Sequence, residues 1–160
     1  MAEIKERKGE HPFGDAAQLV MLGVFAVVWI GDSFVLHLST QLAHWVPLWV
    51  RVVFLGLAVG VAVRLVSVAH VVVSAEERPA QVMTTGAFRY VRHPIYLASL
   101  LGYLGLAVST LSLSSLVLWI IIFGVHDYLA SYEEGLLEAK FGDAYRAYKR
   151  ETGKWLPRWR

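Results

Sequence analysis

Charged and aromatic side chains gather in residues 89–96, a stretch whose composition suits the binding of a small anion. Pro94 fixes its own φ and disfavours the helical conformation at His93, so we expect a helix to begin here. The first backbone N–H groups of that helix have no helical partner, and such a helix start binds carboxylates or phosphates. Basic residues at a membrane-helix end also extend toward lipid headgroups, and this simpler role stays open. The candidate binding residues here are Arg92, His93, Pro94, Ile95 and Tyr96.

Two adjacent carboxylates, Glu133 and Glu134, follow about 36 residues after Tyr96. Acidic pairs near a helix end commonly interact with the helix dipole, which is the simplest interpretation. If the residues between the two stretches form a helical hairpin, however, its two open ends meet and the carboxylates face the basic helix start. With Tyr145 and Tyr148 nearby, this arrangement suits a zwitterionic ligand that carries both an ammonium and a carboxylate.

The composition indicates an all-α polytopic membrane protein that forms a single domain over residues 1–160. Hydrophobic residues make up 56% of the chain and the mean hydropathy is +0.50, whereas soluble domains carry about 45–50% apolar residues. The chain has no cysteine, which excludes disulfides, thiolate metal sites and a cysteine nucleophile. We expect neither a metal site nor a nucleic-acid partner. We expect the first apolar run, which starts near Ala16, to be retained because no clear cleavage site follows it.

Four membrane-spanning helices, of which the last two form a tight hairpin, are expected from the apolar runs. The third run is too long for one helix, and the sequence STLSLSS interrupts it at 109–115. Each arm of this hairpin would have about 15–17 residues, slightly less than a ~30 Å hydrocarbon core requires. The expected spans are residues 16–36, residues 46–73 and the two arms of residues 94–129.

After the hairpin, Leu137, Phe141 and Tyr148 recur at helical spacing and predict a pair of amphipathic cytoplasmic helices. Gly142 is expected to end the first helix and Asp143 to cap the second. Aromatic and basic residues in the tail suit a membrane interface. These tail residues are Arg150, Lys154, Trp155, Arg158, Trp159 and Arg160.

The distribution of basic residues predicts that both termini lie in the cytoplasm. With four spans, thirteen of the fifteen lysines and arginines fall on one side of the membrane, and the cytoplasmic side usually carries the excess of Lys and Arg. The other two, Arg51 and Arg64, lie within the second apolar run, and Arg78 is interpreted as an ordinary loop charge. A soluble ligand is therefore expected to bind on the cytoplasmic face.

Two motifs stand in order along the chain: RHPIY at 92–96, then EEGLLEAKFGDAYRAY at 133–148 with a late proline at 157. Residues 85–157 thereby resemble the integral-membrane methyltransferases, which comprise isoprenylcysteine carboxyl methyltransferases and phospholipid N-methyltransferases. The resemblance implies S-adenosylmethionine as the methyl donor, bound at the cytoplasmic face, and a lipid or lipophilic acceptor. It implies that residues 92–96 hold the amino-acid part of the donor, that Glu133 or Glu134 faces its ammonium or ribose, and that Tyr145 and Tyr148 line the cofactor site. Of the two glutamates, Glu133 is favoured because it shares the helical stripe of Leu137.

The sequence departs from the family pattern in two places. Ala98 stands where the family usually has glycine, and the run HDYLASYEE at 126–134 lacks the arginine that the family often has a few residues before the paired glutamates, which weakens the case for carboxyl methylation. His126 and Asp127 occupy that region instead and, with Asp32, are candidates to orient or deprotonate the acceptor. Ionisable residues in membrane helices are functional suspects, although many of them are structural.

Two other functions stay open at this stage. A membrane reductase of the sterol-reductase type, with NADPH as cofactor, has a similar pattern, although such reductases are generally longer. A non-enzymatic membrane assembly protein is the other alternative, and only the paired motifs argue against it. Whether the chain forms a homodimer is also open.

Overall fold

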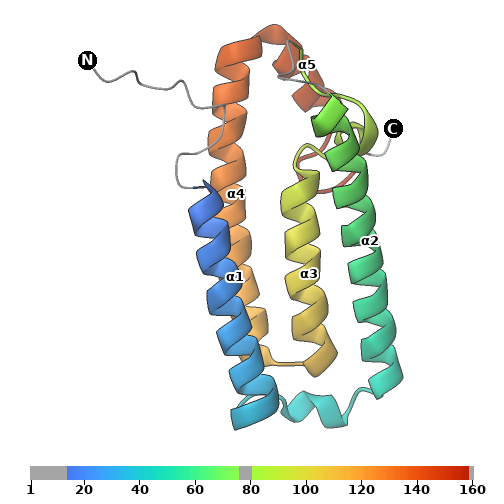
Figure 1. Ribbon diagram of the computed structural model, residues 1–160, viewed down its shortest axis with the longest axis vertical. Helices are drawn as coiled ribbons and strands as arrows, with labels where there is room; N and C mark the ends of the chain where they lie inside the picture. The colour runs from blue at the N-terminus through green and yellow to red at the C-terminus, as the bar shows by residue number, and fades with distance from the viewer. Residues whose placement is uncertain (1–13, 76–80, 159–160) are drawn as a thin grey trace, which may run out of the picture.

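The computed structural model describes residues 14–75 and 81–158 as a bundle of helices with no strand among them (Figure 1). Three of the described helices contain segments that are long and apolar enough to span a membrane, namely 16–36, 48–69 and 113–141, and Pro94–Thr110 is a shorter apolar helix. The expected all-α membrane fold is confirmed. The helices are α1 (Gly14–Ile30), which continues as the π-helix η1 (Gly31–Leu36), α2 (Leu48–Ala75), α3 (Pro94–Thr110), α4 (Leu113–Phe141) and α5 (Asp143–Glu151), with the 3₁₀ turns η2 (Gln41–His44) and η3 (Gly86–Arg89). The predicted positions of Arg78, Trp159 and Arg160 lie outside the described residues.

The two arms of the hairpin differ in length, which the sequence analysis did not predict. Helix α3 has 17 residues, as expected for one arm, but α4 has 29. At 1.5 Å per residue α4 is roughly 43 Å long, so it extends well beyond a ~30 Å hydrocarbon core. No proline interrupts it before Gly142, where φ is +55° and the helix ends as predicted. The first of the two expected amphipathic helices is therefore the end of α4, and only α5 is separate.

The start of α5 also differs from the expectation. Gly142 occupies the cap position, and Asp143 is the first helical residue rather than the cap. The Asp143 carboxylate instead accepts a 2.7 Å hydrogen bond from Arg146 one turn later. Asp143 thus places a negative charge in the first turn, where it interacts favourably with the helix dipole.

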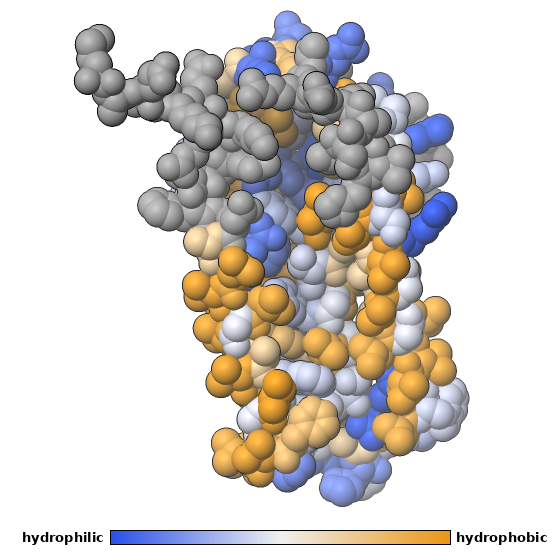
Figure 2. Space-filling view, viewed as in Figure 1, coloured by the Kyte–Doolittle hydropathy of each residue, from blue (hydrophilic) through white to orange (hydrophobic). Residues whose placement is uncertain are grey.

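Helix α3 lies at the centre of the bundle, with α1 and α2 on either side of it and α4 joined to it by the hairpin tip (Figure 1). Its most extensive contact is with α2, and Gly105 permits that close approach. A Cβ atom at Gly105 would lie 3.0 Å from Cβ of Ala58. Figure 2 shows apolar side chains over the flanks formed by α1 and α2, as expected for surfaces that contact lipid.

A buried carboxylate fixes the hairpin tip to the end of the first span. Asp32 is 5% exposed and accepts hydrogen bonds from the backbone N–H of Ser39 at 2.9 Å and from the hydroxyls of Ser39, Ser112 and Ser114. Ser112 also caps α4 by accepting from the backbone N–H of Ser115. This cluster lies at the end of the bundle opposite α5, so Asp32 is far from the other candidate residues and its contacts are those of a structural clasp.

Asp32→Ala is expected to destabilise the fold, because three serine hydroxyls would lose the charged acceptor that they share. A hydrogen bond to a charged group contributes about 1.5–3 kcal/mol, so the free energy of unfolding should fall by about 2–3 kcal/mol. Thermal unfolding in one detergent measures the change. Gln41→Ala is the control, since Gln41 donates to the backbone of Leu38 on the exposed surface. Equal unfolding midpoints for both variants would contradict the proposed structural role of Asp32.

Candidate active site

The stretch that contains the first motif is held between α2 and the C-terminal segment. Gly86 adopts φ +59° at the start of η3, a conformation that favours glycine. His93 lies outside the helical region at φ −123° and ψ 66°, and α3 begins at Pro94, as the sequence predicts. The backbone N–H of Arg92 donates to the carbonyl of Gly153 at 2.9 Å, and Val91 forms a bridge with Gly153. The loop that precedes α3 is therefore fixed by the tail of the chain.

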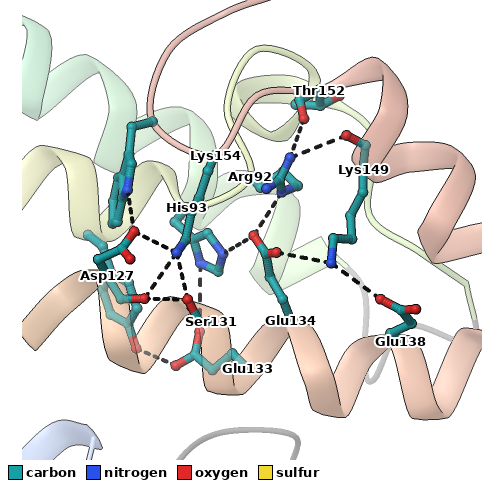
Figure 3. Close-up of polar contacts among 12 residues, drawn as sticks. Arg92, His93, Asp127, Ser131, Glu133, Glu134, Glu138, Lys149, Thr152 and Lys154 are labelled. Carbon is teal, nitrogen blue, oxygen red and sulfur yellow. Dashed lines mark hydrogen bonds and ion pairs between the residues drawn. The ribbon is translucent and has the colours of Figure 1, made fainter.

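Glu134 is the centre of a buried ion cluster at this end of the bundle (Figure 3). Its carboxylate lies 2.8 Å from Nε of Arg92, 3.2 Å from Nε2 of His93 and 3.4 Å from Nζ of Lys149. The side chains of Glu134, Arg92 and His93 are 8%, 9% and 7% exposed. The Arg92 guanidinium also donates to the carbonyl of Thr152 at 2.5 Å. One carboxylate thus joins the loop before α3, helix α4 and helix α5.

Glu133 approaches the other side of the same histidine. Its carboxylate lies 3.8 Å from Nδ1 of His93 and accepts a hydrogen bond from the Tyr96 hydroxyl. The rings of His93 and Tyr96 are stacked, with their centroids 5.8 Å apart. The structure therefore brings the two motifs of the sequence together, while their roles in ligand binding stay predictions. Glu134 is buried at 6% exposure, and Glu133 is partly exposed.

The two tyrosines of α5, Tyr145 and Tyr148, lie on the α5 side of this cluster. Tyr145 and Tyr148 are 2% and 8% exposed, and the Tyr148 hydroxyl donates to the carbonyl of Phe88 at 2.6 Å. Burial raises the pKa of both phenols, so both stay neutral at physiological pH. They border a small cavity of about 100 Å³. Its lining also includes Gln81, Val82, Met83, Phe88, Arg92, Leu137 and Phe141.

His126 lies deeper in the bundle, two turns before Glu133 on α4. It is 1% exposed, and its ring is perpendicular to that of Tyr96, with centroids 5.3 Å apart. Nδ1 lies 2.9 Å from the carbonyl of Ile122, and this contact assigns the proton to Nδ1. Nε2 is buried and has no hydrogen-bond partner among the residues that the structure describes. A buried nitrogen with a free lone pair is costly unless something binds it, which marks His126 as a candidate contact for a ligand.

The carboxylate of Asp127 binds side chains of the C-terminal segment. Its carboxylate lies 2.6 Å from Nζ of Lys154 and accepts from the Trp155 indole at 2.8 Å (Figure 3). The Trp155 ring lies 5.5 Å from that of Phe123 and 6.0 Å from that of His93. Lys154 and Trp155 thus contact α4, and their expected position at a membrane interface stays a prediction. Of the three residues expected to act on an acceptor, His126, Asp127 and Asp32, only His126 has a buried side-chain atom without a hydrogen-bond partner in the described part of the chain.

Lys149, Thr152 and Gly153 were not identified as site residues from the sequence, although each contacts Arg92 or Glu134. Thr152 and Gly153 act through backbone carbonyls, which no side-chain pattern indicates. The one available signal is a glycine two residues after the end of α5, since a Cβ atom at Gly153 would lie 1.9 Å from the carbonyl oxygen of Leu156. A turn this tight is the kind of position that requires glycine.

The fold and the paired motifs define an integral membrane protein with a buried polar site at one end of a helical bundle. The family model of the phospholipid methyltransferases matches residues 64–144, and the chain belongs to this family. The protein-S-isoprenylcysteine O-methyltransferase of Schizosaccharomyces pombe is 34% identical over 97 residues, which are 57% of this chain and 39% of that protein. The chain therefore spans well under half the length of this relative. No solved structure matches the chain significantly.

Gly153→Ala is expected to open the turn that covers the site, because the new Cβ atom would collide with a backbone carbonyl. Loss of the hydrogen bond to Arg92 and displacement of Lys154 should lower the free energy of unfolding by about 2–3 kcal/mol. Gly135→Ala is the matched control: no atom lies within 4 Å of its Cβ position, and alanine is the better helix former by about 1 kcal/mol. Thermal unfolding of both variants in one detergent tests the prediction, which fails if Gly153→Ala is as stable as the control.

Proposed function

We propose that this protein transfers a methyl group from S-adenosylmethionine to a lipophilic acceptor in the membrane. The observation that carries the proposal is the buried cluster of Arg92, His93, Glu133 and Glu134, in a chain of the phospholipid methyltransferase family. The donor presents an ammonium and a carboxylate on one carbon, and both charges find complementary groups here. When bound, the donor supplies an electrophilic methyl group on a sulfonium, and no metal is required.

Glu133 is the carboxylate that we assign to the donor's ammonium. The charge of Glu134 is already balanced by Arg92 and Lys149, so we assign Glu134 to holding the site together. Glu133 lies on the opposite side of His93, next to the Tyr96 hydroxyl. This assignment agrees with the preference for Glu133 that the sequence gives.

We assign the donor's carboxylate to the start of α3. The guanidinium of Arg92 is largely used by Glu134 and Thr152. The first backbone N–H groups of the helix, those of Ile95 and Tyr96, have no partner within the helix. Helix starts of this kind favour anions through these N–H groups and the helix dipole. Arg92 and His93 then hold the loop in the conformation that presents them.

The acceptor is proposed to reach the site from within the membrane. An in-line displacement requires the nucleophile and the methyl carbon to be held in line and water to be kept away. Nε2 of His126 lies in the bundle interior, below the charged cluster, and can accept a proton from a bound acceptor. A phospholipid amine must lose a proton in the reaction, whereas an isoprenylcysteine carboxylate needs no base. The name of the family and the name of the relative thus suggest two acceptors to compare, a phospholipid amine and an isoprenylcysteine carboxylate.

We also place the end of the bundle that carries α5 in the cytoplasm, where a soluble donor is available. The excess of basic residues predicted for this side supports that orientation. Lys149, Arg150 and Lys154 belong to the described part of this surface.

Glu133→Gln and Glu134→Gln are expected to separate donor binding from stability. Glu133→Gln should weaken the binding of S-adenosylhomocysteine about tenfold, a loss of about 1.4 kcal/mol, with little change in unfolding temperature. Glu134→Gln should lower the free energy of unfolding by about 3–5 kcal/mol, because it leaves buried cations without their counter-charge. Calorimetric titration and thermal unfolding measure the two effects.

Asp143→Asn is the control for these variants, since that carboxylate is 94% exposed. Normal affinity in Glu133→Gln would remove it from the donor site. If S-adenosylhomocysteine does not bind the wild-type protein and NADPH does, the methyltransferase proposal is wrong.

His126→Phe is expected to lower turnover and leave donor affinity unchanged. Loss of a general base commonly costs 10²–10⁴-fold in rate, so we expect a fall of about a hundredfold or more with a phospholipid amine as acceptor. Transfer of label from methyl-labelled donor to phosphatidylethanolamine and to a prenylcysteine measures the effect on each acceptor. His126→Gln serves as a second variant if the phenylalanine disturbs packing. Unchanged turnover in both variants, with both acceptors, would exclude His126 from the reaction.

A further inference from the structure

A second cavity lies beside the loop that carries the first motif, between that loop and α2. It is open, has a volume of about 470 Å³, and is separate from the small cavity beside Tyr145. Helix α2 contributes Arg64, Leu65 and Val68 to its lining, and η3 and the residue after it contribute Arg89 and Tyr90. None of the lining residues belongs to the ion cluster around Glu134. The cavity is therefore a feature that the proposed methyl transfer does not use.

Two arginines face this cavity without a counter-charge in the described part of the chain. The side chains of Arg64 and Arg89 are exposed, and neither forms a hydrogen bond or an ion pair with the side chains described for residues 16–69 and 81–158. Arg51, the other arginine of α2, differs because it donates to the carbonyl of Ser109 at 2.9 Å. Tyr90 is 59% exposed and adds a hydroxyl to the same lining. The polar part of the cavity thus offers donors and positive charge, which suit an anion.

The position of the cavity along α2 corresponds to the level of lipid headgroups. Within the described residues the apolar segment of α2 runs from Leu48 to Ala69, and Arg64 lies in the last third of it, beside η3. An arginine in such a position extends its side chain along apolar surface toward the interface. Leu65 and Val68, both half-buried, continue the lining with apolar surface. Polar and apolar surface therefore meet within one cavity, as an amphiphile requires.

We propose that this cavity binds the phosphate of an anionic phospholipid from the adjacent leaflet, with Arg64 and Arg89 as its ligands. Guanidinium groups form paired hydrogen bonds to phosphate oxygens, and two arginines match a phosphodiester whose headgroup carries no ammonium. The acyl chains of the lipid lie along Leu65 and Val68 and continue into the bilayer. The proposal does not depend on methyl transfer, and the lipid bound here is not the acceptor.

Binding of phosphatidylglycerol to the purified full chain in detergent tests the proposal, with native mass spectrometry as the readout. The test variant is Arg64→Gln/Arg89→Gln, and the matched control is Arg146→Gln/Arg150→Gln, which removes two exposed arginines of α5 at the same end of the molecule. We expect one lipid to bind the wild type and the control with equal affinity. We expect the affinity of the test variant to be about tenfold weaker or more. The single variants Arg64→Lys and Arg89→Lys keep the charge but lose the planar fork, and each should lose several-fold.

Equal affinities in the wild type and the test variant would overturn the proposal and reduce the two arginines to ordinary interface anchors. Inorganic phosphate and glycerophosphoglycerol are titrated as competitors to identify the source of the phosphate. If neither competitor displaces the lipid at equal concentration, the result supports a membrane lipid as the ligand of this cavity. If inorganic phosphate binds as tightly as the lipid, the cavity is a site for a soluble anion and the lipid assignment is wrong.

Discussion

The buried carboxylate of Glu134 is the interaction on which the end of the bundle that carries α5 depends. Burying an isolated charge costs several kcal/mol, and only well-placed partners offset that cost. The partners here come from separate segments: Arg92 from the loop before α3, His93 from the start of that helix, and Lys149 from α5. Because Arg92 also donates to the carbonyl of Thr152, the ion pair of Glu134 and Arg92 fixes the C-terminal segment as well. The elements around the candidate site are therefore positioned by one charge rather than by apolar packing alone.

The difference in length between α3 and α4 determines how far along the bundle the carboxylate of Glu134 lies. Helix α3 has 17 residues, about 26 Å, and cannot by itself cross a ~30 Å core, whereas α4 continues well past it. We therefore expect His93 to lie at or just below the headgroup level, with α4 extending beside it and carrying Glu133 and Glu134. A soluble donor and a membrane-embedded acceptor can both reach that level. The short helix is thus a requirement for the proposed chemistry.

Much of this arrangement could be predicted from the sequence, because it follows from local rules. Pro94 fixes the start of α3, Gly142 ends α4, and a hairpin brings its two open ends together whatever its exact length. The sequence did not predict that α4 continues past residue 129, because the ends of the hairpin arms were set by the end of the apolar run. A helix can continue through polar residues, so hydropathy does not show where it ends. The cover formed by Thr152, Gly153 and Lys154 depends on backbone carbonyls and a tight turn. Such contacts have no periodicity by which a sequence pattern could indicate them.

Nε2 of His126, which is buried and has no partner in the described part of the chain, limits where a proton can be taken from an acceptor. His126 and Glu133 are seven residues apart on α4, close to two full turns, so they share one face of that helix and lie about 10 Å apart along it. Tyr96 bridges this distance, since its ring contacts His126 and its hydroxyl donates to Glu133. If Glu133 holds the donor's ammonium and His126 takes the proton of the acceptor, the methyl group is transferred between these two levels, on the side of the ion cluster that faces the bundle interior. An acceptor dissolved in the cytoplasm would have to pass the cluster to arrive there, whereas one carried in the bilayer would not.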